Sequence, residues 1–243
     1  MATEQAKKTA LVISAHAADF VWRAGGAIAL YAERGYRVRI LCLSYGERGE
    51  SERLWKLPGM TVERVKQSRQ AESEKAAALL GGEIRFFDSG DYPLQVTDGL
   101  IRDMVAAYRA LQPEFILTHS YSDPYNRDHD EASAVTLRTR IYAQAAGYPL
   151  EGKKLGAPPV FLFEPHQPEQ CGFKPEVLLD ITPVFDRKRK AMESMEAQEH
   201  LWEYYTDLAK RRGVQAVRNS GKTGIKYAEA YQRVYPQVTG ELS

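Results

Sequence analysis

A histidine and an aspartate stand three positions apart in the stretch SAHAADFVWRAGG, residues 14–26, where they end an apolar run. Imidazole nitrogens and carboxylate oxygens are ligands of Zn²⁺, and a catalytic zinc site uses three protein ligands and leaves a fourth position open. His16 and Asp19 can supply two of these ligands, and His129, in a later loop, can supply the third. The spacing alone also fits a histidine that ends a strand and an aspartate that caps the next helix.

Four of the five histidines lie where apolar runs end or in the loops just after them. In an open parallel sheet, ligands bind beyond the carboxyl ends of the strands, so we expect these side chains and their polar neighbours to share one site. Only His200, inside a long charged segment, lies elsewhere. The polar residues at these ends are His16, Asp19, Glu47, Arg48, Glu50, His119, Asp128, His129, Glu164 and His166.

Short apolar runs that predict strands alternate with amphipathic segments that predict helices. This order predicts an α/β fold with a doubly wound, mostly parallel sheet and helices on both faces. From about Pro183 the chain is charged and helical, and we expect a covering helix of the same domain. No linker or repeat divides the sequence, which predicts a single domain over residues 1–243. The expected strands are 9–16, 37–45, 83–88, 115–120, 159–165 and 177–182, and the expected helices lie within 24–35, 61–82, 97–111 and 129–147.

The composition is that of an ordinary globular protein and argues against several classes of partner. Hydrophobic residues make up 44% and charged residues 27% of the 243 residues, and the formal net charge is +1. This balance does not indicate the excess of basic residues with which proteins bind a nucleic acid or a membrane surface. The two cysteines do not make a disulfide framework, and no apolar stretch approaches the ~20 residues of a membrane span. We therefore expect a soluble, cytoplasmic protein.

Four stretches, in order along nearly the whole chain, carry a family resemblance: SAHAADFVWRAGG, PEFILTHSYSDPYNRDHDEAS, LLDITPVFDRKRKAMESMEAQ and KYAEAYQRV. The first resembles the opening motif of the PIG-L/LmbE-like zinc-dependent N-deacetylases, A-H-P-D-D-E followed by a glycine pair. The second is similar to that family's strand ending in Thr-His and its H-P-D-H motif. The resemblance implies a Rossmann-like fold with Zn²⁺ held by His16, Asp19 and His129. It also implies that Asp128 supports the site from beside a ligand, and we expect His119 to buttress the second motif rather than bind the metal.

The sequence departs from this family where the deacetylases carry their proton-transfer groups. The first aspartate of the D-D pair, their general base, is Ala18 here, and the glutamate after the ligand aspartate is Phe20. The first histidine of H-P-D-H, which assists at the oxyanion, is Asn126, and the proline is Arg127. A well-placed base contributes about 10²–10⁴-fold to a rate, so an ordinary deacetylase should not lose it. We therefore expect the metal to serve another reaction.

The segments AHAAD, YGERGES and EPHQPEQCGF are similar to one branch of the family, the 4-oxalomesaconate hydratases of bacterial gallate degradation. This resemblance implies that water is added across the conjugated double bond of an oxo-tricarboxylate to give 4-carboxy-4-hydroxy-2-oxoadipate. A carboxylate near the site is a suitable base for water, and the position in the motif favours Glu50 over Glu47. His166 is expected to act as the acid, or to orient Glu50 or the substrate.

Other residues of the site loops are expected to bind the small-molecule tricarboxylate. Arg48 and Arg127 can pair with carboxylates in a bidentate way, and Asn126 can donate a neutral hydrogen bond. Members of the family are often homo-oligomers, and the aromatic residues at 202, 204 and 205 are expected in packing or at an interface. Two alternatives stay open: a zinc-dependent amide hydrolase in which Glu50 replaces the lost base, and a family member that binds a metal or ligand without turnover.

Overall fold

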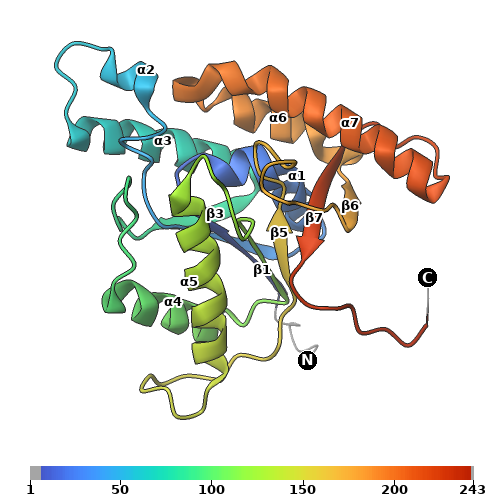
Figure 1. Cartoon of the computed structure of the whole chain (residues 1–243), viewed down its shortest axis with the longest axis horizontal. Helices are drawn as coiled ribbons and strands as arrows, with labels where there is room; N and C mark the ends of the chain where they lie inside the picture. The colour runs from blue at the N-terminus through green and yellow to red at the C-terminus, as the bar shows by residue number, and fades with distance from the viewer. Residues whose placement is uncertain (1–6, 242–243) are drawn as a thin grey trace, which may run out of the picture.

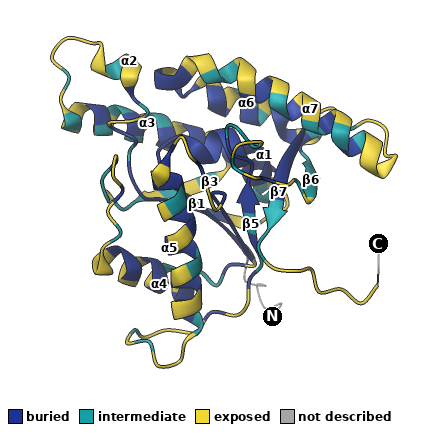
Figure 2. Ribbon diagram, viewed as in Figure 1, coloured by how far each residue is buried: buried dark blue, intermediate teal, exposed yellow. Residues whose placement is uncertain are grey.

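Strand β1 (Thr9–Ser14) runs through the centre of the molecule and is buried on both faces. Ala10 and Val12 pack into the apolar core on one side of the sheet, and Leu11 and Ile13 pack into the core on the other side. Figure 2 shows buried residues concentrated in the strands and in the helix faces next to them. A parallel strand covered on both faces must be apolar throughout, which is why this segment reads as an uninterrupted apolar run.

The computed structural model describes residues 7–241, and its strands form one seven-stranded sheet in the order β3-β2-β1-β4-β5-β7-β6 (Figure 1). The first five strands in this order are parallel, whereas β7 is antiparallel to both of its neighbours. The mostly parallel sheet predicted from the sequence is confirmed, and β7 is a strand that the sequence did not predict. The strands are β1, β2 (Arg37–Cys42), β3 (Gly82–Phe86), β4 (Phe115–Thr118), β5 (Val160–Phe163), β6 (Val177–Asp180) and β7 (Ala228–Arg233).

Helices cover both faces of this sheet, as Figure 1 shows. Helices α1, α3, α6 and α7 pack around one core, and α4 and α5 pack around the other. No helix within residues 7–241 combines the length and the apolar character needed to cross a membrane. The helices are α1 (Asp19–Glu33), α2 (Glu52–Trp55), α3 (Val62–Leu80), α4 (Asp98–Leu111), α5 (Arg127–Gln144), α6 (Phe185–Glu193) and α7 (Trp202–Ser220), with 3₁₀ turns η1 (Thr182–Val184) and η2 (Glu196–Leu201).

The C-terminal helical segment is divided into α6, η2 and α7, so the expectation of one covering helix needs correction. Gln198 within η2 has a non-helical backbone, with φ −126° and ψ 36°. Its side-chain oxygen accepts a hydrogen bond from Arg69 Nη2 at 2.8 Å, and the Ala197 N–H donates to Glu72 Oε1 at 3.0 Å. These two bonds tie the segment to α3, and the chain bends there before α7 begins.

A buried ion pair anchors helix α1 to the last strand of the chain. Lys188 Nζ lies 2.7 Å from Glu229 Oε1 and donates to the Trp22 carbonyl at 2.8 Å. Glu229 accepts a hydrogen bond from the Gly26 N–H at 2.7 Å. In a regular α-helix the Trp22 carbonyl accepts a hydrogen bond from the Gly26 N–H. Lys188 and Glu229 therefore bind the two backbone groups of one helical hydrogen bond of α1. A Cβ atom on Gly26 would lie 2.6 Å from Ile181 Cγ2, which explains the glycine at this position.

Candidate active site

The five parallel strands deliver polar side chains to one edge of the sheet. His16 follows β1, Glu50 lies in the loop after β2, Asp91 follows β3, His129 is in the first turn of α5 after β4, and His166 follows β5. This edge is the carboxyl end of the strands, and the order of the strands reverses at the β1–β4 pair. Open α/β sheets bind their ligands at such a point.

Two histidines and two carboxylates, here called the donor cluster, bring one ligand atom each to within 4.8 Å of one another: His16, Asp19, Glu50 and His129. His16 Nδ1 lies 3.2 Å from Asp19 Oδ2 and 3.3 Å from Glu50 Oε1. His129 Nε2 lies 3.4 Å from Asp19 Oδ1 and 3.9 Å from Glu50 Oε1. The Glu50 side chain, at 13% exposure, is the most accessible of the four.

The donor cluster fits a divalent metal ion. Among residues 7–241, His129 Nε2 and Glu50 Oε2 are buried atoms that have no hydrogen-bond partner. Buried polar atoms in proteins are nearly always paired, so these two indicate a partner that the chain itself does not supply. Imidazole nitrogens and carboxylate oxygens bind transition metals, and a metal ion in the cluster would satisfy His129 Nε2.

Carboxylates on the far side of each imidazole ring set which nitrogen faces the donor cluster. His129 Nδ1 lies 2.8 Å from Asp123 Oδ2. His16 Nε2 lies 3.2 Å from Asp91 Oδ1 and 3.3 Å from Asp128 Oδ2. A ring nitrogen that donates its hydrogen to a carboxylate leaves the other nitrogen free to bind a metal. His16 therefore presents Nδ1 to the cluster, and His129 presents Nε2.

Opposite charges hold the donor cluster together. Burial disfavours the charged form of His16, but the Glu50 carboxylate and the hydrogen bonds to Asp128 and Asp19 raise the pKa of this imidazole well above its usual value. Burial also disfavours the ionised form of Asp19, yet the charge of His129 holds the pKa of that carboxyl well below its usual value. A histidine must be deprotonated to bind a metal, so metal binding releases protons from this cluster.

The loop that carries Glu50 is held by the segment after β3. Asp91 Oδ2 accepts hydrogen bonds from the backbone N–H groups of Arg48 at 2.6 Å and Gly49 at 2.9 Å. The next residue, Tyr92, donates its N–H to Asp128 at 3.0 Å. A Cβ atom on Gly49 would lie 2.0 Å from the Tyr92 ring, so the close contact between the two segments requires a glycine there. These bonds connect the Glu50 loop to the start of α5.

Two residues that the sequence singled out lie beside the donor cluster without belonging to it. The Glu47 carboxyl is buried 3.8 Å from Lys66 Nζ, and burial raises its pKa. His119 Nε2 accepts a hydrogen bond from the Ala15 N–H at 2.9 Å, and its ring stacks on His129 with centroids 4.3 Å apart. This bond occupies the Nε2 lone pair, so His119 supports the surrounding chain.

His166 lies half-buried against aromatic side chains of α7. Its ring centroid is 4.3 Å from that of Tyr204, and the Tyr204 hydroxyl donates to the His166 carbonyl. The Tyr205 hydroxyl lies 3.5 Å from His166 Nδ1. Burial and the positive charge of Arg23 lower the pKa of His166. No hydrogen bond joins His166 to Glu50 within the described part of the chain.

The three residues expected to bind substrate have other contacts in this structure. Asn126 caps α5, and its side-chain oxygen accepts a backbone N–H of the first turn at 3.1 Å. The Arg127 side chain is 77% exposed and pairs with Asp130 at 2.7 Å. Arg48 is exposed and donates from Nη1 to the Asp91 carbonyl at 3.0 Å.

Three charged residues of the site were missed from the sequence: Arg23, Asp91 and Asp123. Arg23 Nε lies 3.5 Å from Asp19 Oδ1, one helical turn after the start of α1. Arg23 stands within an otherwise buried apolar helix, and an isolated charge in such a run is a signal that could have been used. Asp91 and Asp123 follow β3 and β4, so the rule that located the histidines applied to them as well.

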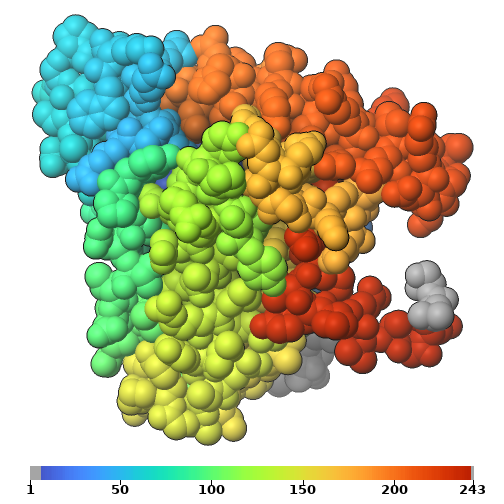
Figure 3. Space-filling model, viewed as in Figure 1, coloured from blue at the N-terminus to red at the C-terminus, as the bar shows by residue number. Residues whose placement is uncertain are grey.

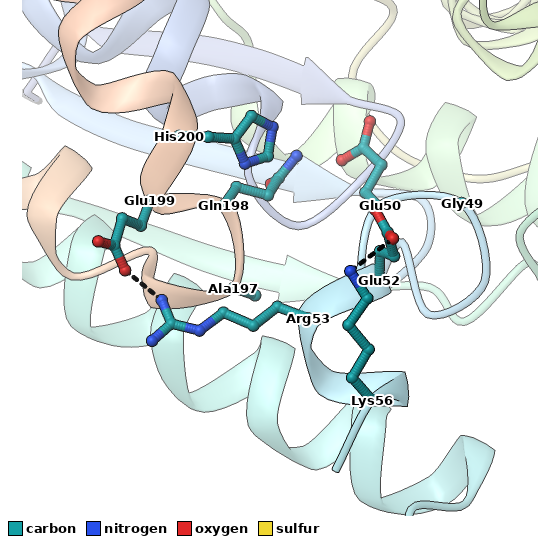
Figure 4. Close-up of a pocket in the computed structure, with 9 residues that line it drawn as sticks. All are labelled: Gly49, Glu50, Glu52, Arg53, Lys56, Ala197, Gln198, Glu199 and His200. Atoms are coloured by element: carbon teal, nitrogen blue, oxygen red, sulfur yellow. Dashed lines mark hydrogen bonds and ion pairs between the residues drawn. The ribbon is translucent and has the colours of Figure 1, made fainter.

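A pocket of about 570 Å³ opens beside Glu50, between the loop after β2 and η2. Figure 4 shows Glu50 at one side of this pocket and Gln198 and His200 at another. Arg53 and Lys56 also line it, and each is paired with a glutamate. Figure 3 shows the region around α2 beside the C-terminal helical segment on this face of the molecule, and η2 is the part of that segment that contacts α2.

Comparison with known proteins shows matches over most of the chain. The family model "PIG-L: GlcNAc-PI de-N-acetylase" matches residues 11–139. The "4-oxalmesaconate hydratase" of Pseudomonas putida strain KT2440 is 54% identical over 240 residues, which cover 98% of this chain and 93% of that protein. The crystal structure of GalB, the 4-carboxy-2-hydroxymuconate hydratase from Pseudomonas putida KT2440, has a TM-score of 0.95 and 54% identity, and covers 97% of this chain and 100% of that one.

A deacetylase relative is more distant. The 1D-myo-inositol 2-acetamido-2-deoxy-alpha-D-glucopyranoside deacetylase of Rhodococcus erythropolis is 27% identical over 173 residues, which cover 62% of this chain and 59% of that protein. The family model spans more than half of the chain, and the hydratase match spans nearly all of it. The chain therefore belongs to the PIG-L family.

Proposed function

We propose that this chain is a metal-dependent hydro-lyase that adds water across the conjugated double bond of 4-oxalomesaconate, an oxo-tricarboxylate, and forms 4-carboxy-4-hydroxy-2-oxoadipate in gallate catabolism. The observation that carries the proposal is the position of Glu50 Oε1, 3.3 Å from His16 Nδ1. Glu50 joins a metal donor set in which Ala18 stands where the deacetylases have their base. A relative with 54% identity along nearly the whole chain bears the name of a hydratase for this substrate.

We propose Zn²⁺ as the metal, with His16, Asp19 and His129 as its ligands. Zinc held there would supply a Lewis acid for the carbonyl or enol oxygen of the substrate. Three protein ligands leave a position for the substrate, and they leave the Glu50 carboxylate for proton transfer.

Glu50 is the proposed base. Its carboxylate borders both the donor cluster and the pocket of about 570 Å³, so it faces the space through which substrate and water reach the cluster. Water gives its proton to Glu50 while its oxygen bonds to one alkene carbon. The alkene electron pair moves to the neighbouring carbon and its conjugated carbonyl group. No group leaves the substrate, so that carbon must take up one proton.

His166 is the proposed donor of this proton. Burial and the Arg23 charge keep the pKa of His166 below its ordinary value in the free protein. A substrate with three carboxylates brings negative charge beside the ring, and a nearby negative charge favours the imidazolium form. Binding of the substrate therefore prepares the proton donor for the reaction.

The remaining expectations concern the surroundings of the site and the whole chain. Arg48 and Arg127 would have to turn inward from exposed positions to bind the substrate, and Asn126 is proposed to donate to it beside the cap of α5. Cys42 and Cys171 are free, which fits a reducing cytoplasmic compartment. A homo-oligomer of single-domain chains completes the proposal.

The test is turnover of 4-oxalomesaconate by the purified, zinc-loaded protein, followed as loss of the conjugated chromophore and by identification of the product. We expect loss of the chromophore, abolished by a chelator and restored by zinc. A protein that binds one equivalent of zinc and leaves the chromophore unchanged would refute the proposal and direct the search to amide substrates.

A further inference from the structure

Two nitrogens of the Arg23 guanidinium are buried without a hydrogen-bond acceptor in the described part of the chain. The side chain is 5% exposed, and its Nε approaches Asp19 Oδ1 only to 3.5 Å. Nε and Nη1 have no hydrogen-bond partner among residues 7–241. Arginine carries five N–H donors and stays protonated, and burying a charged group without partners is unfavourable. The side chain therefore indicates an acceptor that comes from outside the chain.

Arg23 lies between the donor cluster and the two tyrosines beside His166, Tyr204 and Tyr205. On one side it adjoins Asp19, one turn earlier in α1. On the other side it lines a small cavity of about 20 Å³ together with Trp22, Tyr205 and the carboxylates of Glu164 and Glu229, which are paired with Arg212 and Lys188. The ring of Tyr205 stacks on Trp22 with centroids 5.5 Å apart, and its hydroxyl lies 3.5 Å from His166 Nδ1. A ligand that spans the distance from the cluster to His166 would therefore pass the guanidinium.

We propose that Arg23 binds one carboxylate of the substrate and forms an anion subsite between the donor cluster and His166. This inference rests on the proposed function, because it assigns the subsite to the tricarboxylate of the hydratase reaction. The planar fork of a guanidinium matches the two oxygens of a carboxylate. The carbonyl oxygen of a neutral N-acetyl amide can accept a hydrogen bond but does not neutralise the buried charge, so Arg23 favours a substrate with a carboxylate at this position.

Water alone does not account for the arrangement. A cavity of about 20 Å³ has room for one water molecule. One water oxygen has two lone pairs and can accept at most two hydrogen bonds, whereas the unpaired Nε and Nη1 together carry three N–H groups. A carboxylate accepts two parallel bonds and also neutralises the charge.

The test measures binding of tricarballylate, a saturated tricarboxylate, and of glutarate, which is the same molecule without the central carboxylate. Isothermal titration calorimetry is performed on the zinc-loaded wild type and on the Arg23→Met and Arg23→Lys variants. Arg34→Met is the matched control, because it removes an exposed arginine just after the other end of α1. Zinc content and melting temperature are measured for every variant.

We expect Arg23→Met to keep one equivalent of zinc and to bind tricarballylate about 30- to 100-fold more weakly, the usual loss for a buried charged hydrogen bond. Its affinity for tricarballylate should fall to about the affinity of the wild type for glutarate, while Arg34→Met binds like the wild type. Tricarballylate affinity within threefold of the wild type would overturn the subsite. Loss of zinc from Arg23→Met would also overturn it, because Arg23 would then serve to position Asp19.

The Arg23→Lys variant decides the question if Arg23→Met does not fold. Lysine keeps the charge and loses the paired N–H groups, so we expect about tenfold weaker binding of tricarballylate; wild-type affinity would overturn the subsite. Turnover of 4-oxalomesaconate by the wild type tests the proposed function separately. Turnover with an unaffected Arg23→Met variant refutes the subsite alone, and a subsite without turnover refutes the hydratase alone.

Discussion

Replacing Glu50 with glutamine removes the proposed base and keeps the size of the side chain. Glu50 Oε2 has no hydrogen-bond partner among residues 7–241, and glutamine keeps an oxygen for the Oε1 position 3.3 Å from His16 Nδ1, so the substitution removes the charge and keeps this contact. The three other members of the donor cluster, His16, Asp19 and His129, stay in place to bind zinc. The loss should therefore appear in turnover and not in metal content.

The expected magnitude follows from the role of the group. A positioned base contributes about 10²–10⁴-fold, which corresponds to about 2.7–5.5 kcal/mol of transition-state stabilisation. We expect Glu50→Gln to lower kcat by this factor, with little change in KM, in the chromophore assay on protein that holds one equivalent of zinc. Glu47→Gln is the matched control, because that carboxyl is buried on the same loop beside Lys66 and its pKa is already raised by burial.

Two results would refute this reasoning. If Glu50→Gln keeps more than a tenth of the wild-type kcat, the base lies elsewhere. If it loses zinc in parallel with activity, and added zinc restores both, Glu50 is a metal ligand. A loss of equal size in Glu47→Gln would show that the effect belongs to the loop as a whole.

Further predictions concern the supports of the site. Asp123→Asn should weaken zinc binding about 10- to 100-fold, because the imidazole that it orients loses its carboxylate partner; competition with a chromophoric chelator measures this, and an unchanged Kd contradicts it. Lys188→Met should cost about 3–5 kcal/mol of unfolding free energy in a urea titration, because it leaves a buried carboxylate unpaired; a cost under about 1 kcal/mol would show that the pair is unimportant. Gly26→Ala should cost about 1–3 kcal/mol by overpacking, since the added methyl would lie 2.6 Å from a neighbouring side chain; wild-type stability in the same titration would mean that this neighbour moves freely. Arg23→Met should raise the pKa of His166, because the positive charge that lowers it is removed while burial and the charges of the nearby carboxylates remain; proton NMR titration of the ring follows this, and an unchanged pKa would place the two groups further apart than in this structure.

The sequence predicts a strand correctly where helices cover both faces of that strand. β1 is apolar at nearly every position, because helices lie on both sides of the sheet. β7 was missed because its sequence, AEAYQR, alternates small and polar residues. Glu229 in this strand is buried only because Lys188, 41 positions away, supplies the opposite charge. The bend at Gln198 depends in the same way on a distant partner, Arg69.

The residues of the site also divide into those that local sequence indicates and those that depend on distant partners. Residues His16, Glu50 and His129 could be expected together, because the carboxyl ends of parallel strands meet at one edge of the sheet. Asp123 acts through the imidazole of His129, and Asp91 contacts both the imidazole of His16 and the backbone of the Glu50 loop. Their roles depend on how the loops approach one another, and no local pattern in the sequence encodes this.

The bond between Gly26 and Glu229 joins positions 203 residues apart. During synthesis the helix that begins with Asp19 emerges early, whereas β7, whose Glu229 accepts a hydrogen bond from that helix, emerges after all of the proposed zinc ligands. Contacts of such long sequence separation form late in folding. A chain that ends before β7 would therefore keep every proposed zinc ligand and lack the strand that anchors helix α1. The capacity to bind metal should consequently become complete only after β7 has been synthesised.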